Sequence, residues 1–223
     1  MQTFETIKKT ELNNDYTLRE KWYKLNAIKN IGCCSYLYRK YDYPKNYEDF
    51  YNNYTADVTT NYSEVNGRSE EYLNNLSTTL GNYDGNRYSK EDYFNFIIKK
   101  IVCETVDGCS KEKDAKDLIE SKGFDTKLPN PYEDTKLGVD LFVYKEDKLL
   151  CGLQVKPSGY FMGNNWDYLV KKRQFTVEQA KRFESEYKVP MLFFLYDKYS
   201  GNWVKNDKGT FSHRLKDLVN EDG

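Results

Sequence analysis

Three polar residues stand in two strongly apolar segments, 138–144 and 149–157, near the middle of the chain. Asp140 lies in the first segment, and Gln154 and Lys156 lie two residues apart in the second. A buried carboxylate or ammonium group is costly unless it is paired or bound to a metal ion. Two neighbouring strands that carry such groups therefore predict a chemical role, and metal-dependent phosphodiester cleavage is the reaction that suits them best.

The spacing of these residues predicts a hairpin with a defined register. Side chains alternate between faces along a strand. Each segment then has one wholly apolar face, and both apolar faces are expected to pack on one core. A two-residue turn would oppose Asp140 to Leu153, whereas a three-residue loop at 146–148 opposes it to Gln154. The sequence therefore predicts the three-residue loop, with the Cβ atoms of Asp140 and Gln154 about 4.5–5.5 Å apart.

The residue types fit a hard cation. Mg²⁺ takes oxygen ligands, keeps several waters, and can neutralise a phosphate and activate a water. Asp140 would supply a charged oxygen, Gln154 its amide oxygen and Val155 its backbone carbonyl oxygen. Lys156 would orient the attacking water and stabilise the developing charge. The alternative is an edge hairpin whose polar side chains are only solvated.

Composition narrows the range of functions. The chain has 223 residues, 21 of them Tyr, and a formal net charge of −1, which argues against a generic nucleic-acid coat protein. A single histidine, His213, excludes sites built on several histidine ligands, and no phosphate-loop motif for NTP hydrolysis is present. Five cysteines without a C-x-x-C pair are typical of reduced thiols. No apolar run has the length of a membrane span, so we expect a cytoplasmic protein.

The flanking pattern predicts the elements that position the hairpin. Residues 89–92 form a capping box that opens a helix with an apolar stripe, and Ser110 is expected to cap a second helix. A short strand is predicted at 124–128. Residues 176–179 form another capping box and helix start, before an apolar strand at 191–196. The order helix, strand, strand, strand, helix, strand predicts an α/β fold, a mixed β-sheet flanked by helices.

The chain is expected to divide near residue 88. Residues 1–88 are rich in Tyr and Asn and predict a mainly helical region, with Leu18, Trp22 and Leu25 on one helix face. The tyrosine run at 36–43 is expected to pack in a core, and contact with DNA is the alternative. Residues 89–223 hold the more regular elements and the hairpin.

With these elements the chain resembles the PD-(D/E)XK nuclease superfamily, in particular type II restriction endonucleases and, less closely, their MjaI-type group. Gly138-Val139-Asp140 is similar to the PD element, and Gln154-Val155-Lys156 to the (D/E)XK element. The resemblance covers about residues 89–200. It implies a restriction-endonuclease-like core (α-β-β-β-α-β) in residues 89–223 and an accessory region for recognition or dimerisation in residues 1–88.

The chain departs from the family pattern at two positions. Val139 replaces the proline, and Gln154 replaces the acid, which removes one charge from the metal site. The resemblance implies that a helix glutamate compensates, with Glu104 as the first candidate. Glu133 and Asp134 are second choices, and each of these acids can equally be a surface residue.

The function implied by the resemblance is Mg²⁺-dependent, sequence-specific cleavage of double-stranded DNA, with one or two metal ions. A homodimer on a palindromic site and a companion methyltransferase that protects the host are expected with it. A repair or junction-resolving nuclease of the same superfamily is the runner-up. The sequence is also compatible with a catalytically silent DNA-binding module and with an unrelated α/β interaction protein.

DNA contacts are expected in the segment that follows the second hairpin strand. Asn and Arg can hydrogen-bond base edges, and Lys can hold phosphates. The candidates are Ser158, Tyr160, Asn164, Asn165, Lys171, Lys172 and Arg173. The alternative interpretation of this segment is an ordinary loop followed by a helix with a basic first turn, without a role in DNA binding.

Overall fold

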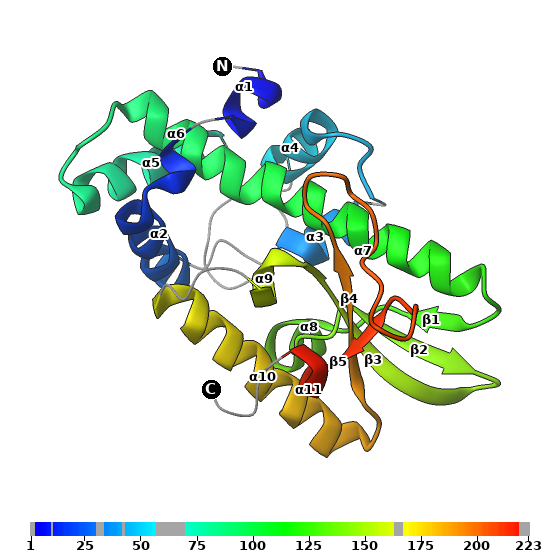
Figure 1. Cartoon of the computed structure of the whole chain (residues 1–223). Helices are drawn as coiled ribbons and strands as arrows, with labels where there is room; N and C mark the ends of the chain where they lie inside the picture. The colour runs from blue at the N-terminus through cyan, green and yellow to red at the C-terminus, as the bar shows by residue number, and fades with distance from the viewer. Residues whose placement is uncertain are drawn as a thin grey trace. The chain divides into compact units, whose positions relative to one another are not determined.

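A computed structural model describes the chain at residues 3–9, 11–29, 34–41, 43–56, 70–162 and 167–218. It forms two compact units, Met1–Ser110 and Lys111–Gly223 (Figure 1). The division thus lies near residue 110 rather than near residue 88. The physical reason is that helix α6 (Lys90–Ile98) packs its apolar stripe into the core of the first unit.

Helices make up the regular structure described in the first unit. In chain order these are α1 (Phe4–Lys8), the 3-10 helix η1 (Glu11–Asn14), α2 (Tyr16–Lys29), α3 (Cys34–Lys40), α4 (Tyr47–Ala56), α5 (Glu70–Asp84), α6, the π-helix η2 (Lys99–Cys103) and the start of α7 (Glu104–Glu120). Their apolar faces share one core, in which Trp22 meets Phe96 edge to face.

Tyr38 from the tyrosine run is buried there, and its hydroxyl donates to the Pro44 carbonyl oxygen at 2.9 Å. Core packing is therefore confirmed for this tyrosine.

A five-stranded mixed sheet forms the second unit (Figure 1). Its strands are β1 (Asp125–Lys127), β2 (Leu141–Lys145), β3 (Lys148–Pro157), β4 (Met191–Tyr196) and β5 (Ser212–Arg214), in the order β1-β2-β3-β4-β5. Strands β3 and β4 are parallel, and the other neighbours are antiparallel. The helices of this unit are the C-terminal part of α7, α8 (Pro131–Leu137), α9 (Gly159–Met162), α10 (Asp167–Tyr187) and α11 (Leu215–Leu218). The predicted α/β class with a mixed sheet flanked by helices is confirmed.

The two faces of this sheet pack against different helices. One face contacts Ala115 and Ile119 of α7 through a cluster that includes Leu141, Val143, Cys151, Leu153 and Val155. The other face meets α10, where Gly152 lies so close to Phe183 that an added Cβ would be 2.6 Å from the ring. The predicted apolar face shared by the two hairpin strands is therefore present. Val139, which precedes β2, and Leu149 are exceptions, because both pack with the cluster on the α10 side.

Two of the three predicted helix starts are wrong. The box at 89–92 is a reciprocal capping box, as predicted. Ser110 lies inside α7, which begins at Glu104, directly after the π-helix η2. Thr176 lies inside α10 and is buried, and its hydroxyl pairs with that of Tyr160 at 2.7 Å. A tertiary hydrogen bond thus replaces the expected cap at Thr176.

The cysteines behave as small apolar residues. Cys103, Cys109 and Cys151 are buried, and Cys34 is partly buried. Burial raises the pKa of Cys103 to about 12 and that of Cys151 to about 11, so both thiols stay protonated at neutral pH. Over the residues that the structure describes, no helix is both long enough and apolar enough to cross a membrane.

Candidate active site

A two-residue turn and a bulge, rather than the predicted three-residue loop, set the register of the hairpin. Glu146 and Asp147 form the turn with φ of 50° and 61°, as in type I′ hairpins. Next to the turn, Tyr144 opposes Leu149. The register then shifts by one residue on β3, because Leu150 is inserted as a bulge.

Beyond the bulge, Leu141 opposes Leu153. The strand pairing ends there, because Asp140 precedes β2 and its backbone N–H donates to the carbonyl oxygen of Leu153 rather than to that of Gln154. The predicted loop length is therefore wrong, although the predicted register is confirmed between Leu141–Leu153 and Val143–Cys151. The opposition of Asp140 to Gln154 stays a prediction. A bulge corrects the register that the shorter turn alone would impose.

The carboxylate of Asp140 lies beside the end of β3 that β2 does not pair with. This edge is open in strand pairing, although Asp140 and Val155 are buried. Strand β2 begins only at Leu141, while β3 continues to Pro157 beside β4. The Asp140 backbone N–H donates to the Leu153 carbonyl oxygen at 2.8 Å. Its side-chain Oδ2 accepts from the Val155 backbone N–H at 2.7 Å. The side chain thus satisfies a donor that a further residue of β2 would otherwise bind.

The Val155 carbonyl oxygen faces the same edge as its N–H. In a β-strand the N–H and C=O of one residue point toward the same neighbour. Because the Val155 N–H points to Asp140, its carbonyl oxygen also points to the open side of β3. One carboxylate and one backbone carbonyl are therefore directed to the same place.

Lys156 forms a loose ion pair with Asp140. Its Nζ lies 3.7 Å from Asp140 Oδ2, and its side chain is 24% exposed. This distance is too long for a direct hydrogen bond. Oδ1 of Asp140 has no hydrogen bond to any residue that the structure describes. Asp140 Oδ1 and Lys156 Nζ can therefore each make further hydrogen bonds.

Two buried glutamines meet at Gly138. Gly138 ends α8 with a φ of 69°, a conformation that suits glycine. A Cβ at this position would lie 2.6 Å from Gln154 Nε2 and 2.9 Å from Gln179 Oε1. Gln179 belongs to α10, and its Nε2 donates to the Thr135 carbonyl oxygen at 2.9 Å. The sequence pattern assigns Gln179 to a capping box, and its burial beside the hairpin is not visible in that pattern.

The acids expected to compensate for Gln154 have other partners. Glu104 belongs to the first unit, and its carboxylate pairs with Lys100. Glu133 closes the capping box of α8 and accepts from the Tyr187 hydroxyl at 2.6 Å. This hydrogen bond, together with burial, raises the pKa of Tyr187 to about 12. Asp134 lies in the first turn of the same helix.

The predicted DNA contacts divide into three kinds. Asn164 and Asn165 lie outside the described residues. Tyr160 holds α9 against α10, since its carbonyl oxygen accepts from Arg173 Nε at 2.9 Å and its hydroxyl donates to the carbonyl oxygen of Lys172 at 2.9 Å. The backbone N–H of Ser158 donates to β4 at Tyr196. The side chains of Lys171 and Lys172 are exposed, with Lys172 Nζ 5.8 Å from the centre of the Tyr160 ring.

The oxygen donors at this site fit a weakly held Mg²⁺ ion. Mg²⁺ is commonly bound through one or two carboxylates, with water and substrate phosphate completing its shell. Asp140 provides one carboxylate, and Val155 and Gln154 can add neutral oxygens. Across the described ranges, no group of three acidic, cysteine or histidine side chains is arranged to hold a metal ion. No protein-family model, curated protein or solved structure matches this chain.

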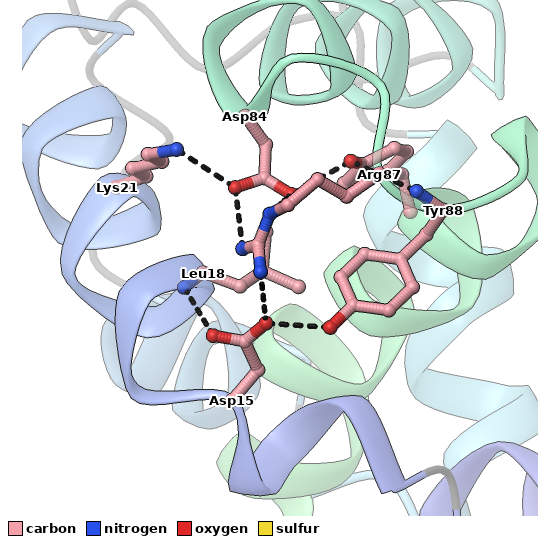
Figure 2. Close-up of polar contacts among 7 residues, drawn as sticks. Asp15, Leu18, Lys21, Asp84, Arg87 and Tyr88 are labelled. Carbon is pink, nitrogen blue, oxygen red and sulfur yellow. Dashed lines mark hydrogen bonds and ion pairs between the residues drawn. The ribbon is translucent and has the colours of Figure 1, made fainter.

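A second buried carboxylate, Asp84 in the first unit, has a contrasting environment (Figure 2). Its oxygens accept from Lys21 Nζ at 2.9 Å, from Arg87 Nε and Nη2 at 3.1 and 2.7 Å, and from the Tyr93 hydroxyl at 2.8 Å. Arg87 also bridges to Asp15 Oδ2 at 2.9 Å.

Asp15 caps α2 in the same network. Its Oδ1 accepts from the Leu18 backbone N–H at 2.9 Å and its Oδ2 from the Tyr88 hydroxyl at 2.6 Å. The network therefore contains two acids and two cations and joins α2 to the turn between α5 and α6. The position of Asp15 before a helical stretch is the one sequence signal that indicates this network.

Proposed function

We propose that this chain is a Mg²⁺-dependent endonuclease that hydrolyses phosphodiester bonds of double-stranded DNA at specific sequences, as type II restriction enzymes do. The observation that carries the proposal is the open edge of β3. There the Asp140 carboxylate, the Val155 carbonyl oxygen and the partly exposed Lys156 ammonium group come together. Asp140 Oδ1 accepts no hydrogen bond from the described residues and Lys156 lies 3.7 Å from Oδ2, so both groups can bind a cation and a phosphate.

Each residue of the hairpin has a distinct role in this proposal. Mg²⁺, when bound, would neutralise phosphate charge and lower the pKa of a water. Asp140 would hold the cation, while its Oδ2 accepts from the Val155 N–H. Gln154 and Val155 add neutral oxygens. Lys156 donates hydrogen bonds to the attacking water and to the phosphate oxygen on which charge develops.

The sheet topology supports the proposed family resemblance. The helix α7, strands β1 to β3, the helix α10 and strand β4 follow one another in the order that the PD-(D/E)XK core has, with the short helices α8 and α9 inserted. The parallel β3–β4 pair places the ends of two strands at one edge, where α/β proteins commonly bind ligands. Sequence specificity, a homodimer, a role of the first unit in recognition, and a companion methyltransferase are parts of the same proposal.

The test is incubation of the purified chain with long unmethylated DNA, with Mg²⁺ or with EDTA. Asp140→Asn keeps an oxygen acceptor for the Val155 N–H and removes the charge, and Lys156→Ala removes the ammonium group. We expect both variants to lower the cleavage rate by about 10²–10⁴-fold. Asp147→Asn and Lys148→Ala are matched controls on the same hairpin, since both side chains are exposed, and they should cleave as the wild type does.

The products distinguish this function from the related ones. Discrete fragments that require Mg²⁺ and both residues would support a sequence-specific endonuclease. Cleavage of branched DNA alone would favour a junction-resolving or repair nuclease. Folded protein that leaves every DNA intact would overturn the nuclease proposal. A catalytically silent DNA-binding module would then be favoured, because Gln154 leaves the site with one carboxylate.

A further inference from the structure

A cavity of about 980 Å³ lies on the sheet face opposite to Gln154 and Lys156. Its floor is formed by apolar side chains of the three central strands, among them Val143, Leu153 and Leu192. These residues belong to the cluster on the α7 side, whereas Gln154 and Lys156, which alternate with Leu153 and Val155 along β3, face the α10 side. The cavity is therefore separate from the proposed active site, and its volume is within the range of small-molecule sites.

The wall of the cavity is a well-bonded loop. Asn206 organises this loop through its side chain, which accepts from the backbone N–H groups of Lys208 and Thr210 and donates to the Ser212 carbonyl oxygen. The buried His213 lies at the cavity, and its Nε2 is 3.2 Å from the Val204 carbonyl oxygen. A wall with this many internal hydrogen bonds is preformed rather than assembled on binding.

The rim of the cavity has an excess of positive charge. Lys205, Lys208 and Arg214 line it together with two acids. Of the acids, Asp217 accepts from the Arg214 backbone N–H at 3.2 Å, and Asp207 is exposed. Lys205 Nζ lies 5.6 Å from the centre of the Phe211 ring. The side chains of Lys208 and Arg214 have no ion-pair partner within the described ranges, so they are available to an incoming anion.

We propose that this cavity binds a small amphipathic organic anion, with an apolar, ring-sized body on the floor and one acidic group at Lys208 and Arg214. The floor matches the body because it is apolar. The acidic group matches the two unpaired cations, which attract an anion at the rim. A neutral ligand of the same shape leaves this charge interaction unused.

Two fluorescent probes test the proposal on the full chain. Anilinonaphthalene sulfonate carries an apolar body and one sulfonate, and N-phenyl-1-naphthylamine has the same body without the charge. We expect saturable binding of both, with the sulfonate bound more tightly. The double variant Lys208→Gln/Arg214→Gln should weaken sulfonate binding by about fivefold and leave the neutral probe unchanged.

The control variant is Lys181→Gln/Arg182→Gln, which removes one lysine and one arginine that are exposed on α10. It should bind both probes as the wild type does. In NMR spectra, the backbone amide chemical shifts that change when the sulfonate probe is added should be those of residues 204–214 and of the strands beneath them. Absence of saturable binding, an equal effect of the two double variants, or shifts centred elsewhere would each overturn the proposal.

Discussion

Asp84 and Asp140 are both buried carboxylates, with 4% and 7% of their residue surface exposed, but their oxygens are used very differently. Asp84 accepts four hydrogen bonds, from two cations and a tyrosine. Asp140 accepts one backbone hydrogen bond and has a lysine at 3.7 Å. Burial alone therefore does not distinguish the two acids, whereas the completeness of their hydrogen bonding does.

Under the proposed function, this difference separates a structural acid from an acid that binds a cation. The Asp84 network places its charges where each is compensated, so it fixes the helices that contribute to it and offers nothing to a ligand. At Asp140 the fold supplies only enough bonding to hold the side chain in place. One oxygen of Asp140 accepts no hydrogen bond from the described residues, and the Lys156 ammonium group lies 3.7 Å from the other oxygen.

The largest expected effect on stability is that of Asp84→Asn. The substitution removes the carboxylate that pairs with Lys21 and leaves Arg87 with Asp15 alone. Loss of one partner of a buried ion pair costs about 3 kcal/mol. Asp140→Asn should cost about 1 kcal/mol or less, because the amide oxygen still accepts from the Val155 N–H. Urea unfolding of the two variants measures this difference.

An exposed pair provides the reference for that measurement. Asp117 pairs with Lys113 at 2.8 Å, and its side chain is 56% exposed. Asp117→Asn should change the free energy of unfolding by about 0.5 kcal/mol or less. If Asp140→Asn proves as costly as Asp84→Asn, Asp140 has a structural role and the contrast between the two acids is lost.

Gly138→Ala tests how closely the site is packed. A positive φ at alanine costs about 1 kcal/mol, and the new methyl group would also meet Gln154 and Gln179 at under 3 Å. We expect a total loss of about 2 kcal/mol in the free energy of unfolding. Gly123 is the matched control, since its φ is 79° and a Cβ there meets nothing within 4 Å. Equal losses in the two variants would mean that the glutamines do not pack tightly around Gly138.

Gln154→Glu tests the single-carboxylate character of the site. A second acid beside Asp140 adds like-charge repulsion in a buried place, so we expect a loss of about 1 kcal/mol in EDTA. Mg²⁺ should restore this stability, because a second carboxylate strengthens cation binding. Thermal unfolding with and without Mg²⁺ measures the effect. Gln174→Glu, on the exposed side of α10, should not respond, and a similar lack of response in Gln154→Glu would contradict the proposed site.

The sequence predicts the register of the hairpin better than the bulge that produces it. The alternation of apolar residues along β3 is enough to set Leu141 opposite Leu153, because one face of the hairpin must be buried. The bulge at Leu150 is not predictable, since a leucine suits a regular strand equally well. The boundary near residue 110 is missed for a similar reason. The apolar stripe of α6 shows that the helix is buried but does not show which core it joins.

Contacts between residues far apart in the chain cannot be predicted from any local sequence pattern. The Asp84 network joins positions as far apart as 15 and 93, and each residue taken alone has the sequence context of a surface charge or a turn. Gln179 lies beside Gln154 only because α10 crosses the sheet at that point. The buried Thr176 likewise finds its partner in α9 rather than at a helix start.

The smallest expected effect is the acid sensitivity of the Asp84 network. Burial acts to raise the pKa of Asp84, but hydrogen bonds from Arg87 and its other donors outweigh it and hold the pKa below the ordinary 3.8. Asp15 is shifted in the same direction: burial acts to raise its pKa, and hydrogen bonds outweigh it. An acid whose pKa is lowered by folding contributes stability that is complete above its unfolded pKa and is lost as the pH falls toward the folded one.

Between pH 6 and pH 4 the two acids together should therefore cost the wild type less than about 1 kcal/mol, with a steeper loss below pH 4. Urea unfolding at each pH measures the slope. In Asp84→Asn the slope should be shallower, because one of the two titrating groups is gone. A variant that keeps the full wild-type slope would show that protonation of other carboxylates controls acid unfolding. The saturated hydrogen bonding of Asp84 would then not be what stabilises the first unit against acid.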